Sequence, residues 1–344
     1  MNPNFKFGLK VAALAAVALG GALTSVFAAS VTPVFSVLER ISGPDGGGWD
    51  YTSIDAVSRQ LYLARGAGAL RMDLETRKIA PVAIPGAGLH TAAVAGDTGL
   101  VFTTNGQKNT VSIFDTKTGK VLGDVRVGEA PDAAVYDPST KLLAVMNHRG
   151  GTVSLVDIIR LAVVKTIPVG GELEFAAATG DGRLFVNVED KHEVAVLDLA
   201  AGKVLHHWVM AGCEDPSGLV YDAADQLVAS VCGNGVTKFL HAADGTEAAS
   251  LKTGQGSDAL IYDAARALLF VPAGEDGTLA VVTLGRAPTV VQVLKTAGSA
   301  RLGALDAKTG RVYLPVGKEG PPAPGQKRPS IVKGSFGFLV VGAQ

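Results

Sequence analysis

The sequence predicts an all-β protein built from repeats, and three observations lead to this prediction. Short apolar segments recur at intervals of about 42 residues and begin at Leu61, Leu100, Leu142, Leu184, Leu227, Leu268 and Val312. After each segment come a turn-rich loop and a further strand, often of alternating polarity as in 110–115. Helical periodicity is essentially absent beyond residue 28. Four strands in each of seven repeats predict a seven-bladed β-propeller with four-stranded antiparallel blades.

The composition supports a folded chain without a nucleic-acid partner. The chain has 31 basic and 32 acidic side chains, a formal net charge of −1. This even balance gives no electrostatic attraction for nucleic acid or for an anionic membrane. Hydrophobic residues make up 47% of the chain and charged residues 18%, which excludes a disordered protein and provides for a sizeable core.

The first 28 residues have the features of a secretory signal peptide. Lys6 and Lys10 precede an uncharged apolar run over 11–23, and Val26 and Ala28 occupy the −3 and −1 positions of a cleavage site. The alternative is an uncleaved N-terminal anchor. No other stretch reaches the ~18 apolar residues of a membrane span. We therefore expect residues 29–344 to form one mature domain, with no membrane span, in the periplasm or outside the cell.

A recurring aspartate marks the turn between the first two strands of many repeats. It stands five or six residues before the apolar segment, at Asp55, Asp137, Asp222, Asp263 and Asp306. Its carboxylate can bind the backbone of a tight hairpin. These residues are therefore interpreted as turn residues.

The strand count predicts how the ring closes. The last repeat supplies three strands, near 301–305, 311–315 and 335–341, and lacks a fourth. The segment 34–41 offers one spare strand before the first repeat. We expect this N-terminal strand to complete the last blade through main-chain hydrogen bonds.

One stretch carries a resemblance to a known family. The segment NTVSIFDTKTGKVLGDVRVGEAPDAAVYDPSTKLLAV (109–145) resembles the YVTN-type repeat of the YncE-like family, which are exported bacterial seven-bladed propellers. The likeness extends over about 35–341, and 213–222 and 334–342 are similar to one exported branch. The resemblance implies a periplasmic scaffold or binding protein, and it supplies no catalytic motif.

The two cysteines, Cys213 and Cys232, are expected to form a disulfide, because an even number of cysteines in an exported chain favours pairing between them. If 217–221 and 227–231 pair as a hairpin, position 232 faces about position 216, close to Cys213. A metal site or a redox thiol is the alternative.

One polar position recurs when the repeats are aligned. It is the expected first residue of each inner strand: Asp50, His90, Asp132, Glu174, Ser217, Asp258 and Arg301. Inner strands of a propeller run roughly along its axis, so these side chains should surround one mouth of the central channel. Like charges held close raise each other's pKa or attract a cation. We consider a small-molecule or peptide site here, with a simple polar channel lining as the alternative.

Part of this ring suits a divalent cation such as Ca²⁺ or Zn²⁺. The candidate ligands are Asp50, His90, Asp132, Glu174 and Asp258. Loops joining second and third strands should emerge on the same face, and they add two candidate ligand-binding residues, His148 and His192. Solvated loop tips are the alternative for these two histidines. No sequence motif identifies a cofactor.

An insertion interrupts the last repeat. Residues 317–334 contain four prolines and four basic residues where other blades have short loops. Proline-rich composition makes this segment extended and semi-rigid. It is expected either to lie over the acidic mouth or to act as a partner-binding arm.

Together these observations favour a binding or scaffold protein that presents its channel mouth to a small molecule, a peptide or a protein partner. The chain lacks the G-x-S-x-G, H-E-x-x-H, C-x-x-C-H and Walker motifs. The alternative is a metal-dependent hydrolase or lactonase acting at the mouth, where the ring would supply both oxygen ligands and a general base.

Overall fold

A computed structural model describes residues 33–322 and 329–344. Pro33–Gln344 form one compact unit. The predicted signal peptide, residues 1–28, lies outside the described residues. So do residues 323–328 of the proline-rich insertion.

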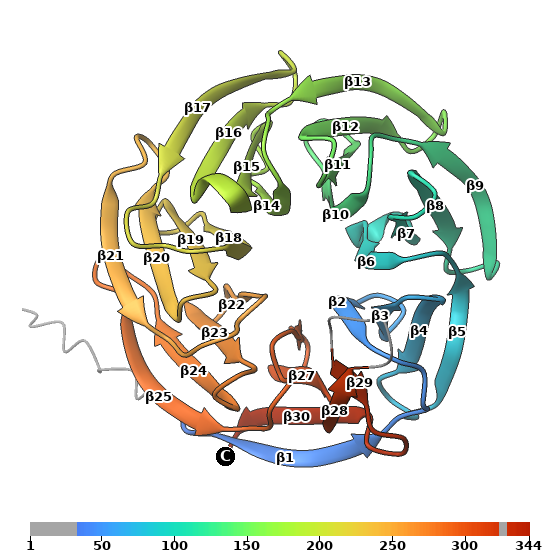
Figure 1. Cartoon of the computed structure of the whole chain (residues 1–344), viewed down its shortest axis with the longest axis vertical. Coiled ribbons are helices and arrows are strands. Elements are labelled where there is room, and N and C mark those ends of the chain that lie inside the picture. Colours follow the sequence, from blue (N-terminus) through green and yellow to red (C-terminus); the bar gives the residue numbers. More distant parts are fainter. Residues whose placement is uncertain (1–32, 323–328) are drawn as a thin grey trace, which may run out of the picture. The chain divides into compact units, whose positions relative to one another are not determined.

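Seven four-stranded antiparallel sheets stand around a ring (Figure 1), which confirms the predicted seven-bladed β-propeller. The inner strands are β2 (Trp49–Asp55), β6 (Leu89–Val94), β10 (Pro131–Asp137), β14 (Leu173–Ala178), β18 (Pro216–Asp222), β22 (Ile261–Asp263) and β26 (Ala304–Asp306). The second strands are β3 (Gln60–Arg65), β7 (Leu100–Asn105), β11 (Leu142–Asn147), β15 (Arg183–Val188), β19 (Leu227–Cys232), β23 (Leu268–Ala273) and β27 (Arg311–Val316).

The remaining strands complete the blades. The third strands are β4 (Gly68–Asp73), β8 (Thr110–Asp115), β12 (Thr152–Asp157), β16 (Glu193–Asp198), β20 (Val236–His241), β24 (Thr278–Thr283) and β30 (Gly337–Ala343). The outer strands are β5 (Ile79–Pro85), β9 (Lys120–Arg126), β13 (Ala162–Pro168), β17 (Lys203–Val209), β21 (Glu247–Lys252), β25 (Thr289–Lys295) and β1 (Phe35–Ser42). Two short 3₁₀ turns and one small hairpin are added: η1 (Gly96–Thr98), η2 (Glu189–Lys191), and β28 (Glu319–Pro322) with β29 (Pro329–Ile331).

The N-terminal strand closes the ring, as predicted. β1 pairs antiparallel with β30, from Phe35 opposite Ala343 to Ser42 opposite Gly337. Phe35 is 1% exposed, and its ring meets Phe270 edge-on with centroids 5.0 Å apart. The side chain of Gln292 in β25 accepts from the Phe35 N–H at 2.9 Å and donates to its carbonyl at 2.7 Å. β1 is thus held both by its own blade and by the neighbouring one.

The recurring aspartates are turn residues, as predicted. The buried carboxylate of Asp137 accepts hydrogen bonds from the backbone N–H groups of Ser139 and Thr140. In its own turn, Asp306 accepts one backbone hydrogen bond, from the N–H of Lys308, and Arg59 of the neighbouring blade donates to its carboxylate at 2.7 Å. These carboxylates therefore both shape a hairpin and, at Asp306, connect two blades.

The prediction that each ring residue begins its inner strand is wrong. In five blades the ring residue is the second of its strand and lies in a β-bulge. In β2 the register is Trp49 opposite Arg65 and Thr52 opposite Leu63, so two residues oppose a single one between these pairs. The same irregularity occurs in β6, β10, β14 and β18. In the other two blades, Asp258 and Arg301 precede short inner strands. A bulge bends the strand and redirects its side chains.

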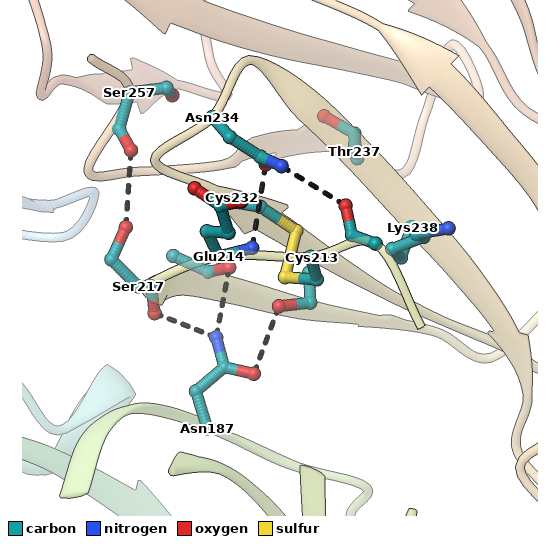
Figure 2. The surroundings of a disulfide bond; sticks show 12 residues. Asn187, Cys213, Glu214, Ser217, Cys232, Asn234, Thr237, Lys238 and Ser257 are labelled. Carbon is teal, nitrogen blue, oxygen red and sulfur yellow. Dashed lines mark hydrogen bonds between the residues drawn. A yellow bond between two sulfur atoms is a disulfide. The ribbon is translucent and has the colours of Figure 1, made fainter. Parts of the chain in front are cut away.

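Cys213 and Cys232 form the predicted disulfide, with their Cα atoms 5.3 Å apart. Figure 2 shows the bridge next to the start of β18, where Pro216 is opposite Cys232. From the preceding blade, the buried amide of Asn187 donates to the Ser217 carbonyl at 2.8 Å. The disulfide at Cys213 and the hydrogen bond from Asn187 therefore both restrain the chain near Ser217, one of the predicted ring residues.

Candidate functional site

The seven predicted ring residues come together at one mouth of the channel. They line a small cavity of about 130 Å³, which we call the polar well, with Tyr51 and Glu189 as the further lining residues. The direction of the strands explains why these residues converge. Each inner strand starts at the end of the channel where the second strand of its blade finishes. In the first blade, for example, Trp49 at the start of β2 is opposite Arg65 at the end of β3. The polar well is thus built from the beginnings of seven inner strands and one loop.

A wider cavity of about 630 Å³, which we call the vestibule, shares lining residues with the polar well. Its walls include Trp49, Gln107 and Arg149. Described residues of the β28–β29 hairpin, among them Glu319 and Ile331, also line it. The proline-rich insertion therefore borders the mouth.

His90 lies between two carboxylates. Its Nδ1 is 2.9 Å from Asp50 Oδ2 and 3.6 Å from Asp132 Oδ2. These three residues come from three successive blades. Burial and the nearby charges of Glu174 and Asp50 raise the pKa of Asp132 well above its usual range. This carboxyl group therefore holds a proton more strongly than an exposed aspartate.

A second histidine approaches the polar well from the loop between β11 and β12. The Nδ1 atom of His148 is 3.4 Å from Glu174 Oε1 and 3.2 Å from the Leu173 carbonyl. Its hydrogen bond to Glu174 raises the pKa of His148 to about 9. The imidazolium is therefore the prevailing form of His148 at neutral pH.

The far side of the polar well contains an ion pair between Asp258 and Arg301. Burial raises the pKa of Asp258 to about 6 although Arg301 opposes the shift. Arg301 also donates to the Trp49 carbonyl at 3.3 Å. The hydroxyl of Ser217 donates to the Ser257 carbonyl at 3.1 Å, so this ring residue connects two blades.

Glu189 enters the polar well from η2. Burial and then the charge of Glu174 raise its pKa to about 7. The other candidate loop histidine, His192, is not among the described residues that line the polar well or the vestibule. It ends η2 with a left-handed backbone, φ 54°, and its N–H donates to the Glu189 carbonyl at 3.2 Å. The loop thus presents Glu189 where the sequence suggested the histidine.

Tyr51 forms the floor of the polar well. It is 8% exposed, and its hydroxyl donates to Glu174 Oε2 at 3.0 Å across the channel. Its ring lies against Phe175, with centroids 4.9 Å apart. Burial raises the pKa of Tyr51 well above its usual range, so the phenol remains a donor. The sequence analysis did not identify Tyr51 as a site residue. Only the β-bulge explains why two adjacent residues, Asp50 and Tyr51, both reach the channel.

Metal-ligand geometry is present within part of the ring. Two groups place one ligand atom per residue within 4.8 Å of one another: Asp50, His90 and Asp132, and Asp132, His148 and Glu174. A third group adds Glu172 and Glu189 to His148. Among the described residues Asp258 joins none of these groups and pairs with Arg301 instead. Four of the five predicted ligands therefore lie in suitable positions.

Comparison with known proteins supports the fold. No family profile matches the chain, and no curated protein is detectably similar to it in sequence. U3-55K resembles this chain with 11% sequence identity and a TM-score of 0.74, over 88% of this chain and 97% of that one. A chain of the mitotic checkpoint complex has 12% identity and a TM-score of 0.72, over 90% of this chain and 95% of that one. Kuenenia stuttgartiensis hydrazine synthase has 15% identity and a TM-score of 0.68, over 80% of this chain and 92% of that one.

At such low sequence identity, these similarities establish only the fold class. The RRP9 WD40 repeats are similarly related, with 11% identity, TM-score 0.74 and coverage of 88% of this chain and 97% of that one. The chain is thus a seven-bladed β-propeller with WD40-like structural neighbours. In the ranges 33–322 and 329–344, no helix is long and apolar enough to cross a membrane.

Proposed function

We propose that this chain is an exported binding protein, periplasmic or secreted, of the YncE-like type. The polar well holds a cationic group of its ligand, and the vestibule accommodates the rest of a small molecule, a peptide or a protein loop. One observation carries this proposal: five carboxyl groups line one small cavity, the polar well, together with a single arginine and a single histidine.

The charge balance favours a positively charged group. With His148 included, three basic side chains face the carboxyl groups of Asp50, Asp132, Glu174, Glu189 and Asp258. Burial is the main cause of the raised pKa values of Asp132, Glu189 and Asp258, and the charges of neighbouring carboxylates raise them further. An ammonium or guanidinium group would replace the retained protons and form charge-assisted hydrogen bonds.

The shape of the mouth agrees with this chemistry. A ligand site usually combines a concave enclosure with a few convergent polar groups. Here the narrow well of about 130 Å³ would take a head group, and the vestibule of about 630 Å³ would take the body of the ligand. The mitotic checkpoint complex shows by its name that one structural neighbour belongs to an assembly. For this chain, a protein partner offering a lysine or arginine side chain would satisfy the same well.

A head-group series tests the proposal. The melting temperature of the mature protein should rise with butylammonium and butylguanidinium, and stay constant with butyramide and butyrate at equal ionic strength. Asp132→Asn should abolish the rise. The matched control is Glu214→Gln, because Glu214 is exposed and does not line the well. A parent protein that responds equally to all four compounds would refute the assignment.

A metal-dependent hydrolase is the second candidate, and the position of Asp132 in two potential ligand groups favours it. A metal there would polarise a carbonyl or activate water, and carboxylates such as Glu189 would be available as a base. Elemental analysis together with melting curves in Ca²⁺, Zn²⁺ and chelator tests this candidate. A parent unaffected by either ion and by chelator would remove it.

A further inference from the structure

The opposite end of the channel contains a second cavity. It has a volume of about 370 Å³ and is lined by the later parts of the inner strands; we call it the far hollow. Its wall and floor include Tyr51, Ala93, Tyr136, Phe175, Ala177 and Tyr221. Tyr51 lines both the far hollow and the polar well, so its ring separates two chambers of one channel.

The far hollow differs chemically from the polar well. None of its described lining residues carries a charge. Ala93, Ala134 and the alanines of 176–178 line the far hollow, and their side chains are small enough to leave this space open. Tyrosine rings and Phe175 provide flat apolar surfaces around that space, a composition typical of small-molecule sites.

Two hydroxyl groups beside the far hollow lack a hydrogen-bond partner within the described part of the chain. Thr91 lines the far hollow and is 3% exposed. Its backbone N–H donates to Thr104 Oγ1 at 3.0 Å, but its own hydroxyl has no hydrogen-bond partner among the residues that the structure describes. The same is true of the hydroxyl of Thr52 on the adjacent inner strand. Their oxygen atoms are almost fully enclosed, so these hydroxyls adjoin the far hollow without opening onto it.

We propose that the far hollow is a second ligand site, which binds a small neutral aromatic molecule. The aromatic ring packs against Tyr51 and Phe175. A charged ligand is disfavoured because it would lose hydration without meeting an opposite charge. This site lies beyond the proposed function, since it uses another cavity and the opposite chemistry.

Titration calorimetry with a matched set of probes tests this proposal. We expect 2-naphthol to bind once per chain, at least tenfold more tightly than naphthalene-2-sulfonate or cyclohexanol. Ala177→Phe should fill the hollow and weaken 2-naphthol binding at least tenfold. Ile159→Phe is the matched control, because Ile159 is 83% exposed on a blade turn away from the channel.

Two outcomes would overturn the proposal: 2-naphthol fails to bind the parent, or a folded Ala177→Phe protein binds it as tightly as the parent. Should Ala177→Phe fail to fold, Ala93→Leu provides the same test with a smaller side chain. Binding of butylammonium is measured on the same samples. Loss of butylammonium binding alone therefore counts against the polar well and leaves the far hollow intact.

Discussion

The ring closure can be tested at a single side chain, Phe35. This residue is 1% exposed and packs between its own blade and Phe270 of the preceding one. Replacing a fully buried Phe by Ala costs about 3–5 kcal/mol, part of which is the lost aromatic pair. Since the stability of a domain is about 5–15 kcal/mol, Phe35→Ala should remove a large fraction of it.

Urea unfolding monitored by fluorescence and far-UV circular dichroism measures this loss. The control is Val34→Ala, which alters the neighbouring residue at 60% exposure and should change the unfolding free energy by less than about 0.5 kcal/mol. A loss under about 1 kcal/mol for Phe35→Ala would refute the closure argument. Deleting residues 33–42 is the more severe test: it leaves β30 as an open edge, so aggregation or a much lower melting temperature is expected.

Three further predictions concern the disulfide, a titrating histidine and export. Thiol titration of denatured, unreduced mature protein should find no free thiol, and the double variant Cys213→Ser, Cys232→Ser should lose about 3 kcal/mol of stability; two reactive thiols would contradict the bridge. Because Glu174 raises the pKa of His148 to about 9, protonation of His148 stabilises the fold fully below its ordinary pKa of 6.5, and this contribution disappears as the pH rises through about 9. Glu174→Gln should lower the His148 pKa by roughly one unit or more in an NMR titration, and an unchanged value would refute the pairing. N-terminal sequencing of the exported chain should begin at Ala29, whereas a membrane-bound chain retaining residues 1–28 would show an uncleaved anchor.

The repeat architecture could be predicted because its signals are local. Each apolar segment, each turn aspartate and the spare N-terminal strand can be identified within a few residues of sequence. The disulfide followed from the same hairpin spacing, with Pro216 opposite Cys232. The seven ring residues were located by aligning the repeats, since equivalent positions of equivalent strands must lie at one height along the axis.

The details of the site could not be predicted in the same way. A β-bulge is a property of register between two strands, so neither Asp50 nor Tyr51 reveals it in a single strand. Bulging brings Tyr51 across the channel to Glu174, 123 residues away. The choice between Glu189 and His192 depends on the left-handed backbone at the end of η2. The size of the far hollow depends on how six inner strands diverge, which composition alone does not specify.

The pH dependence of cation binding tests the central claim most directly. The carboxyls of Asp258, with a pKa of about 6, Glu189, with a pKa of about 7, and Asp132, with a raised pKa, retain protons in the unliganded well. A bound ammonium group must displace these protons. Calorimetric titration with butylammonium should therefore show affinity that increases from pH 5.5 to pH 8, with protons released into buffers of different ionisation enthalpy. Affinity that is absent, or independent of pH without proton release, would contradict the account.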